Sequence, residues 1–188
     1  MVDRLPEVEG LAERWGRSVF HCPYCHGYEL QNGRIGALAS GSNSVHLALL
    51  LPEWGSVTLF LNGACALEGE QAIEFTARGV RVEAAAVAAV VDRATVVLTD
   101  GRRVELDGLF VTSRTEPASP LALQLGCAVD EGPAGPFVRT DDMKATTVPG
   151  VFACGDVGRA TGNIAMAVGD GAMAGTAVHR SLVFAAPR

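Results

Sequence analysis

Residues 34–51 read R-I-G-A-L-A-S-G-S-N-S-V-H-L-A-L-L-L. The segment opens with a short apolar run, Arg34 to Ser40, which ends in small residues and is typical of a buried strand. Gly41 to Ser44 then form a polar turn, and the apolar residues from Val45 to Leu51 suit a helix that Pro52 ends. A strand, a turn of small residues and a helix in this order predict an α/β domain.

The pattern continues on the C-terminal side. A second strand, a helix and a third strand are expected at Ser56–Leu61, Glu68–Arg78 and Val80–Val82. Shorter strands follow as a meander with an Asp-Gly hairpin turn and a closing strand, and they are expected at Val87–Val91, Thr95–Thr99, Arg102–Leu106 and Leu109–Val111. This layout predicts a three-layer nucleotide-binding domain with a parallel sheet and a β-meander.

The two ends of the chain are less regular. The first sixteen residues look like a lead-in rather than an element, and the polar, proline-containing segment from Ser113 to Pro120 indicates a domain boundary. Beyond it, the sequence predicts one or two helical turns, a loop, a short strand and a long helix, at Leu121–Leu125, Gly132–Pro136, Val151–Cys154 and Asn163–Val183 in that order.

Composition excludes several classes of protein. The 188 residues carry a formal charge of −6, and the 15 basic residues, of which only Lys144 is a lysine, form no cluster, so nucleic-acid binding is not expected. No apolar run is long enough for a membrane span, and the first residues lack a signal-peptide pattern. We therefore expect a cytoplasmic protein whose five cysteines do not form a disulfide scaffold.

Residues 21–27, H-C-P-Y-C-H-G, carry the strongest local motif. Cys22 and Cys25 are separated by two residues, which in a cytosolic α/β chain indicates a redox dithiol. A helix starting at Cys22 would favour its thiolate, and the adjacent His26 could exchange protons with a thiol. Half of a zinc site, a c-type haem attachment sequence and a purely structural pair are the alternatives.

The turn after the first strand is a degraded dinucleotide motif. A G-x-G-x-x-G/A pattern would let the backbone approach a pyrophosphate, and here its positions are Ala39, Gly41 and Ser44. Asn62 stands where a ribose-reading residue is expected. The turn predicts an NADP(H) site made by Gly41, Ser42, Asn43 and Ser44, and a nucleotide-binding fold without a nucleotide is equally compatible with it.

A third motif, T-V-P-G-V-F-A-C-G-D, covers residues 147–156. Its final Gly155-Asp156 follows an expected strand, so the carboxylate would lie at the ligand-binding edge of a sheet. Asp156 could there accept a hydrogen bond from a flavin ribityl hydroxyl. The helix starting at Asn163, Ile164 and Ala165 would point its N-terminus at the flavin ring.

With these three motifs in this order, residues 11–183 resemble the thioredoxin-reductase-like flavoprotein disulfide oxidoreductases. The resemblance implies that Cys22 and Cys25 are the redox pair and that His26 replaces an acidic proton donor. It also implies that Gly155, Asp156 and the segment Asn163–Ala165 contact FAD. Residues 17–113 would be the NAD(P)-binding-like domain, with residues 1–16 and 114–188 belonging to an incomplete FAD domain.

The resemblance leaves three possibilities open for the function of the chain. Family members begin with a glycine-rich FAD-binding segment, and this sequence starts after the matching point. The chain would act on a small-molecule or protein disulfide or dithiol, with FAD and NADP(H) as cofactors, and as a homodimer. A dithiol oxidase that passes electrons to oxygen without NADPH, and a non-catalytic remnant, are the alternatives.

Overall fold

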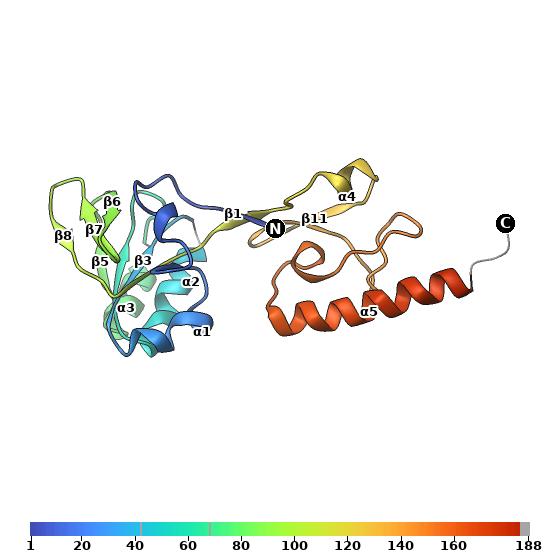
Figure 1. The fold of residues 1–188 in the computed structure, drawn as a ribbon. Coiled ribbons are helices and arrows are strands. Elements are labelled where there is room, and N and C mark those ends of the chain that lie inside the picture. Colours follow the sequence, from blue (N-terminus) through green and yellow to red (C-terminus); the bar gives the residue numbers. More distant parts are fainter. Residues whose placement is uncertain (42, 68, 185–188) are drawn as a thin grey trace. The chain divides into compact units, whose positions relative to one another are not determined.

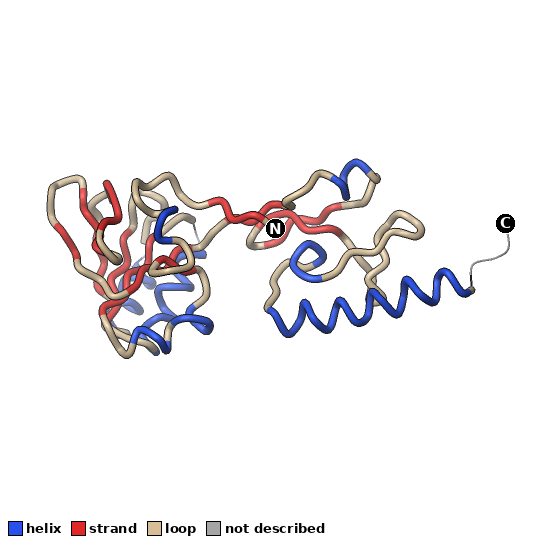
Figure 2. Tube along the Cα trace, viewed as in Figure 1, coloured by secondary structure: helices blue, strands red, loops and turns tan. Residues whose placement is uncertain are grey.

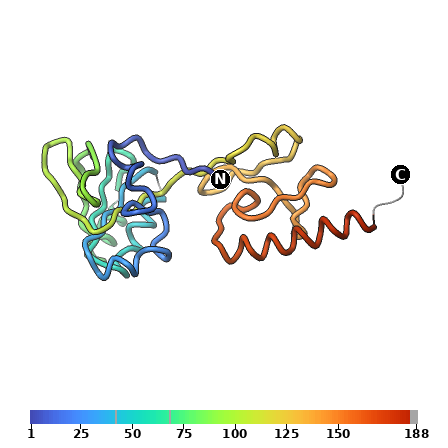
Figure 3. Tube along the Cα trace, in the orientation of Figure 1, coloured from blue at the N-terminus to red at the C-terminus, as the bar shows by residue number. Residues whose placement is uncertain are grey.

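The computed structural model describes residues 1–41, 43–67 and 69–184 (Figure 1). The chain divides into two compact units. We call Leu5–Ser113 the sheet unit, and Met1–Arg4 with Arg114–Arg188 the long-helix unit. The chain therefore passes between the units twice, which can be followed along its trace in Figure 3.

A five-stranded parallel sheet forms the centre of the sheet unit. Its order is β2-β9-β3-β4-β5. The strands are β2 (Val19–Phe20), β9 (Gly108–Val111), β3 (Arg34–Leu38), β4 (Ser56–Phe60) and β5 (Arg81–Glu83). Three of them, β3, β4 and β9, are almost entirely buried apolar residues, as expected for a parallel sheet covered on both faces.

Helices cover one face of this sheet. Alternate strand residues such as Ile35, Leu59 and Phe110 point to that face and pack with buried residues of α2 (Asn43–Leu50) and α3 (Gly69–Ala77). The helix α2 passes directly into the 3₁₀ turn η3 (Leu51–Glu53), which contains Pro52.

A three-stranded antiparallel meander covers the opposite face. It consists of β6 (Val87–Val91), β7 (Thr95–Leu98) and β8 (Arg103–Val104). Leu38, Phe60 and Leu109 pack there in a second core with residues of the meander. The layers are therefore helix, parallel sheet and meander, which confirms the predicted α/β class, and Figure 2 shows their helices and strands in separate colours.

The long-helix unit has two small antiparallel pairs and one long helix. β1 (Val2–Arg4) pairs with β10 (Arg114–Glu116), and β11 (Val129–Gly132) pairs with β12 (Gly135–Val138). The helical elements are α4 (Leu121–Gln124), the 3₁₀ turn η4 (Gly155–Gly158) and α5 (Ile164–Val183). Along α5 only Asp170, Ala174 and Ala177 are buried.

Three expectations about the ends of the chain were wrong. The first sixteen residues contain β1 and the 3₁₀ turn η1 (Ala12–Arg14), and Leu11 is fully buried in the meander-side core. The expected loop at Gly132–Pro136 is the turn of the β11–β12 hairpin, because Gly135 adopts a positive φ that reverses the chain.

The third concerns Val151–Cys154, where the structure has no strand. Phe152 forms a single bridge with Ala145, and the left-handed φ of +72° at Gly155 ends the extended run before a ladder can develop. Among the described residues, no helix has the length and apolar character that a membrane crossing requires.

Candidate active site

Cys22 and Cys25 lie at the start of a one-turn helix, α1 (Pro23–His26). Pro23 occupies the first helical position, where its fixed φ is suitable and its missing N–H is not needed. Cys22 is the extended residue just before it, and its Sγ atom lies 2.6 Å from that of Cys25. Two sulfur atoms this close can alternate between dithiol and disulfide with little backbone movement.

The hydrogen bond between the sulfurs determines which one keeps a proton. Cys25 donates to Cys22, and this bond, partial burial and the neighbouring Cys22 charge together raise the pKa of the Cys25 thiol to about 11. Cys25 therefore stays protonated at neutral pH, with Cys22 as the acceptor. Because the thiolate is the attacking form of a cysteine, the raised pKa makes Cys25 the less favourable nucleophile of the pair at neutral pH.

His26 lies on the same turn but contacts other groups. Its ring stacks on Phe20, with centroids 4.2 Å apart and an interplanar angle of 17°. Its Nδ1 atom lies 3.2 Å from a carboxylate oxygen of Glu29. No hydrogen bond between described residues joins the ring to either sulfur, so a proton-transfer role for His26 stays a prediction.

A surface depression of about 740 Å³ begins at Gly27, the residue that follows α1. Its lining includes aromatic and acidic side chains and consists of Gly27, Tyr28, Glu29, Gln31, Asn32, Glu53 and Trp54. Trp54 packs edge-on against Tyr24, a residue between the two cysteines, with ring centroids 5.3 Å apart. A Cβ atom at Gly27 would lie 2.5 Å from the Trp54 ring, so this glycine is what allows the indole to approach α1.

The predicted nucleotide turn follows β3, and its serine side chains hydrogen-bond within the turn and to Thr112. The hydroxyl of Ser44, which is fully buried, accepts from the backbone N–H of Ser40 at 3.0 Å and lies 3.2 Å from the Thr112 hydroxyl. Ser40 Oγ also donates to the Thr112 carbonyl oxygen. Asn43 begins α2. A Cβ atom at Gly41 would have no neighbouring heavy atom within 4 Å. Ser42 lies outside the described residues.

Asn62, at the end of β4, has a structural role. It adopts a left-handed φ of +47°, and its side-chain Oδ1 accepts a hydrogen bond from the backbone N–H of Val87 at 2.8 Å. This bond ties the sheet to the first strand of the meander. Residues 61–67 contain no arginine or lysine that could read a ribose phosphate.

The predicted flavin residues gather in the long-helix unit. Gly155 opens η4, and a Cβ atom there would lie 3.7 Å from Ala167 on α5. The carboxylate of Asp156 is exposed and lies against Gly162, where a Cβ atom would be only 2.9 Å from its Oδ1. The structure thus brings Asp156 to the beginning of α5.

The start of α5 is capped by Asn163. Its side-chain oxygen accepts from the backbone N–H of Met166 at 2.9 Å, and the first helical residues, Ile164 and Ala165, are exposed. The dithiol and the nucleotide turn belong to the sheet unit, whereas these residues belong to the other unit.

The sequence analysis missed a buried ion triad behind this segment. Asp170 on α5 is 3% exposed, receives two hydrogen bonds from Arg159 and lies 3.1 Å from Nζ of Lys144. Arg159 chiefly, and Lys144 with it, hold the pKa of Asp170 well below its usual range. The only signal in the sequence was a single acidic residue in a helix of small and apolar residues, which requires a cationic partner when buried.

A metal site is one of the alternatives that the sequence leaves open for the cysteines. Within the described ranges, no group of three or more histidine, cysteine and acidic side chains is placed to hold a metal ion.

Comparisons with known proteins place the chain in a family. Residues 3–171 match the family model described as pyridine nucleotide-disulphide oxidoreductase. The thioredoxin reductase tcpT of Claviceps purpurea is 33% identical over 193 residues, covering 96% of this chain and 60% of that protein. The thioredoxin reductase sirT of Leptosphaeria maculans is 30% identical and is covered to 59%.

A solved structure agrees with these relatives. The crystal structure of an oxidoreductase from Agrobacterium tumefaciens has 51% sequence identity and a TM-score of 0.95, over 98% of this chain and 63% of that one. The chain therefore spans about three fifths of the length of the proteins it matches. It belongs to the pyridine nucleotide-disulphide oxidoreductase family and is thioredoxin-reductase-like.

Proposed function

We propose that this chain is the dithiol-bearing part of an FAD-dependent oxidoreductase that acts on a disulfide or dithiol substrate. The observation that carries the proposal is the contact between Cys22 and Cys25 on an exposed one-turn helix. Family membership supports an oxidoreductase of the thioredoxin reductase type.

The exchange at this pair balances as a thiol–disulfide reaction. The sulfur of Cys22 attacks one sulfur of the substrate disulfide, a mixed disulfide forms, and the first substrate thiol leaves with a proton. Cys25 then loses its proton and attacks Cys22, which releases the second substrate thiol. Two electrons pass from the enzyme dithiol to the substrate, and the reverse sequence oxidises a substrate dithiol.

The residues of the long-helix unit fit the flavin end of FAD. The exposed carboxylate of Asp156 can accept a hydroxyl hydrogen bond, and the exposed first turn of α5 offers a surface for the ring. Bound flavin would supply the two-electron redox partner of the dithiol. Gly155, Asp156, Asn163, Ile164 and Ala165 are the residues that we propose hold it.

The depression that begins at Gly27 supports the proposal of a substrate that docks on aromatic rings. Trp54 and the largely exposed Tyr28 supply apolar surface, while Glu29 and Glu53 make the rim acidic. Such a lining favours a small-molecule or protein disulfide that carries neutral or cationic groups.

The nucleotide turn supports a second candidate activity, the oxidation of a substrate dithiol with oxygen as electron acceptor. Asn62 is committed to Val87, and the hydroxyls of Ser40 and Ser44 are committed to Thr112. A chain whose nucleotide-reading groups are used internally offers NADPH fewer contacts, which is compatible with an electron flow that does not use NADPH. Oxygen would then take up the two electrons and two protons of the substrate dithiol and leave as hydrogen peroxide.

The redox role of the pair is tested by counting thiols. The chain is reduced with dithiothreitol, desalted, and titrated with a thiol reagent before and after mild oxidation. We expect the two counts to differ by two in the natural chain and in a Cys154→Ser control, because Cys154 lies in the other unit. A difference of two that persists in Cys22→Ser would disprove the assignment.

The two activities are separated by the visible spectrum. Purified chain is mixed with FAD without oxygen, and then with NADPH or with a small dithiol. Bleaching by NADPH supports the reductase, and bleaching by the dithiol alone, reversed by air, supports the oxidase. Because the chain by itself is expected to retain little FAD, the flavin is added at a concentration that saturates it, and a bound-flavin spectrum that neither reagent changes supports the third possibility, a non-catalytic remnant.

A further inference from the structure

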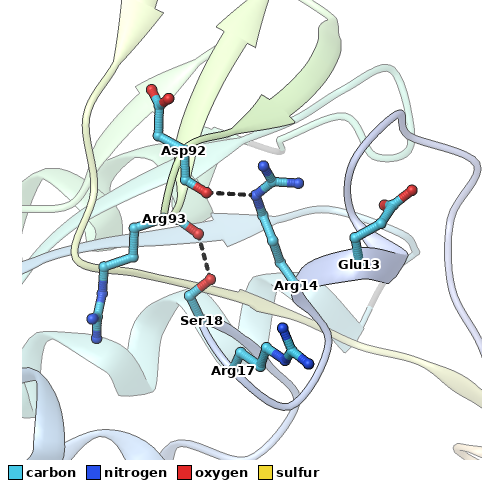
Figure 4. A pocket seen from close by; sticks show the side chains of 6 residues that line it. All are labelled: Glu13, Arg14, Arg17, Ser18, Asp92 and Arg93. Carbon is cyan, nitrogen blue, oxygen red and sulfur yellow. Dashed lines mark hydrogen bonds between the residues drawn. The ribbon is translucent and has the colours of Figure 1, made fainter.

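A second cleft lies in the sheet unit, away from the dithiol and the nucleotide turn. It has a volume of about 370 Å³ and is lined by Glu13, Arg14, Arg17, Ser18, Asp92 and Arg93 (Figure 4). Ser18 comes just before β2, at the amino end of the parallel sheet, whereas the nucleotide turn follows the carboxyl end of β3. The two places therefore lie at opposite edges of the sheet.

The walls of the cleft are fixed by hydrogen bonds to backbone oxygens. Arg14 donates to the carbonyl oxygens of Asp92 at 2.8 Å and of Gly10 at 2.7 Å. The buried hydroxyl of Ser18 donates to the carbonyl oxygen of Arg93, which joins the lead-in of β2 to the β6–β7 turn. Figure 4 shows Ser18 between the side chains of Arg17 and Arg93.

These arginines form no ion pair with another described residue, although Arg93 acts electrostatically on the carboxylate of Asp107. Most other arginines of the described chain form ion pairs, but none of the ion pairs between described residues includes Arg14, Arg17 or Arg93. Arg93 uses its Nε–H on the carbonyl oxygen of Asp107 at 3.0 Å. A guanidinium has five N–H donors, so most donors of these side chains make no hydrogen bond to another described residue.

The acidic residues of the cleft compensate only part of this charge. Asp92 is already paired with Arg103, at 2.9 Å, which leaves Glu13 as the other carboxylate in the lining. This local excess of positive charge occurs in a chain whose formal charge is −6. Guanidinium forks match the geometry of phosphate oxygens, and the volume exceeds that of a simple ion.

We propose that this cleft binds the phosphate group of a small phosphorylated molecule. Arg17 and Arg93 donate to the phosphate oxygens, and Arg14, held by two carbonyl oxygens, forms the rigid wall. The cleft is separate from the proposed redox site, so this proposal does not depend on the redox role of the dithiol.

Nuclear magnetic resonance of the 15N-labelled full chain tests this proposal. The probes are inorganic phosphate and phenyl phosphate, with acetate at equal ionic strength for comparison. We expect both phosphates to shift the side-chain Nε–H signals of Arg17 and Arg93, and acetate to shift them far less. Shifts centred on Gly41 and Ser44 would place the phosphate at the nucleotide turn and overturn the proposal.

Substitutions provide the control. Arg17→Gln with Arg93→Gln should weaken phosphate binding by roughly tenfold or more, since charge-assisted hydrogen bonds are lost. Arg81→Gln removes the same kind of charge from an exposed position outside the cleft and should change the affinity less than about twofold. Cys22→Ser should leave binding unchanged. Equal losses in Arg81→Gln and in the cleft variant would mean that the anion binds without a specific site.

Discussion

The side-chain oxygen of Asn62 accepts a hydrogen bond from the backbone N–H of Val87, at 2.8 Å. This contact occupies the residue that would otherwise read a nucleotide ribose, and it fastens the meander to the end of β4. In this family member the position therefore stabilises the domain instead of offering a free polar group to a ligand.

We predict weak binding of pyridine nucleotides as a result. Ala39 replaces the first glycine of the turn and is buried in the helix-side core, and no arginine is near Asn62 in the sequence to pair with a 2′-phosphate. Isothermal titration calorimetry should give dissociation constants no tighter than the high-micromolar range for both NADPH and NADH. A value near 1 μM for either, about 8 kcal/mol, would contradict this prediction.

The raised pKa of Cys25 predicts slow alkylation of the reduced pair. With a pKa of about 11, the Cys25 thiol is mostly protonated at pH 8, and its reaction with iodoacetamide should accelerate as the pH rises towards 11. Cys22→Ala removes the acceptor, so the pKa of Cys25 should fall towards the ordinary cysteine value of 9.0. Alkylation at pH 8 should then be faster by about an order of magnitude.

Peptide mass spectrometry distinguishes Cys25 from the other cysteines. Cys154, which is exposed in the long-helix unit, serves as the internal reference for reagent activity. An unchanged rate at Cys25 in Cys22→Ala, with an unchanged rate at Cys154, would show that the hydrogen bond between the sulfurs does not control the proton.

We predict that this chain by itself retains little FAD. The ribityl contact offered by Asp156 is one charge-assisted hydrogen bond, worth roughly 1.5–3 kcal/mol, which is too little for submicromolar affinity. Protein purified without added flavin should be colourless, and added FAD should be lost on gel filtration. A yellow protein with nearly one FAD per chain would contradict the prediction, and Asp156→Asn would then show whether this carboxylate is involved.

The ion triad predicts that replacing the Asp170 carboxylate with an amide lowers the thermal stability of the chain strongly. Asp170→Asn keeps the size of the side chain but leaves Arg159 and Lys144 without their shared carboxylate. The melting temperature should fall by about 5 °C or more, measured by calorimetry. Asp142→Asn, at an exposed position after β12, changes the charge equally and should leave the melting temperature within about 1 °C.

The same triad sets a direction for the dependence of stability on pH. The pKa of Asp170 is lowered in the folded chain, so the unfolded chain binds the proton more readily. The stabilisation is complete above the unfolded pKa, about 3.9, and is lost as the pH falls below it. The difference in stability between the natural chain and Asp170→Asn should therefore shrink below about pH 4. A difference that stays constant from pH 7 to pH 3 would be inconsistent with a charged Asp170.

Much of the sheet unit was predictable because burial and periodicity agree there. The apolar runs of β3 and β4 are followed by small residues or glycine, and α2 ends at Leu50, just before the 3₁₀ turn that contains Pro52, so local residue types mark where each element ends. The Asp100-Gly101 turn similarly indicated the β7–β8 hairpin, although β8 has only two residues.

The long-helix unit was predicted less well for physical reasons. The pairing of β1 with β10 joins residues more than a hundred positions apart, and such partners leave no local pattern. The strands β11 and β12 are only partly buried, so they lack an apolar alternation. For the site, the cysteine spacing indicated the dithiol. The stacking of His26 on Phe20 and the hydrogen bond between Asn62 and Val87 could not be predicted, because both depend on tertiary contacts.

Lys144 is the single lysine of the chain, and its side chain is only 14% exposed in the triad. The adjacent backbone is also engaged, because its carbonyl oxygen accepts from Ala153 and the next N–H donates to Asp141. A lysine-specific protease thus has one target bond, and these hydrogen bonds must open before that bond can be cut. The rate of this one cleavage consequently measures how often the long-helix unit opens locally.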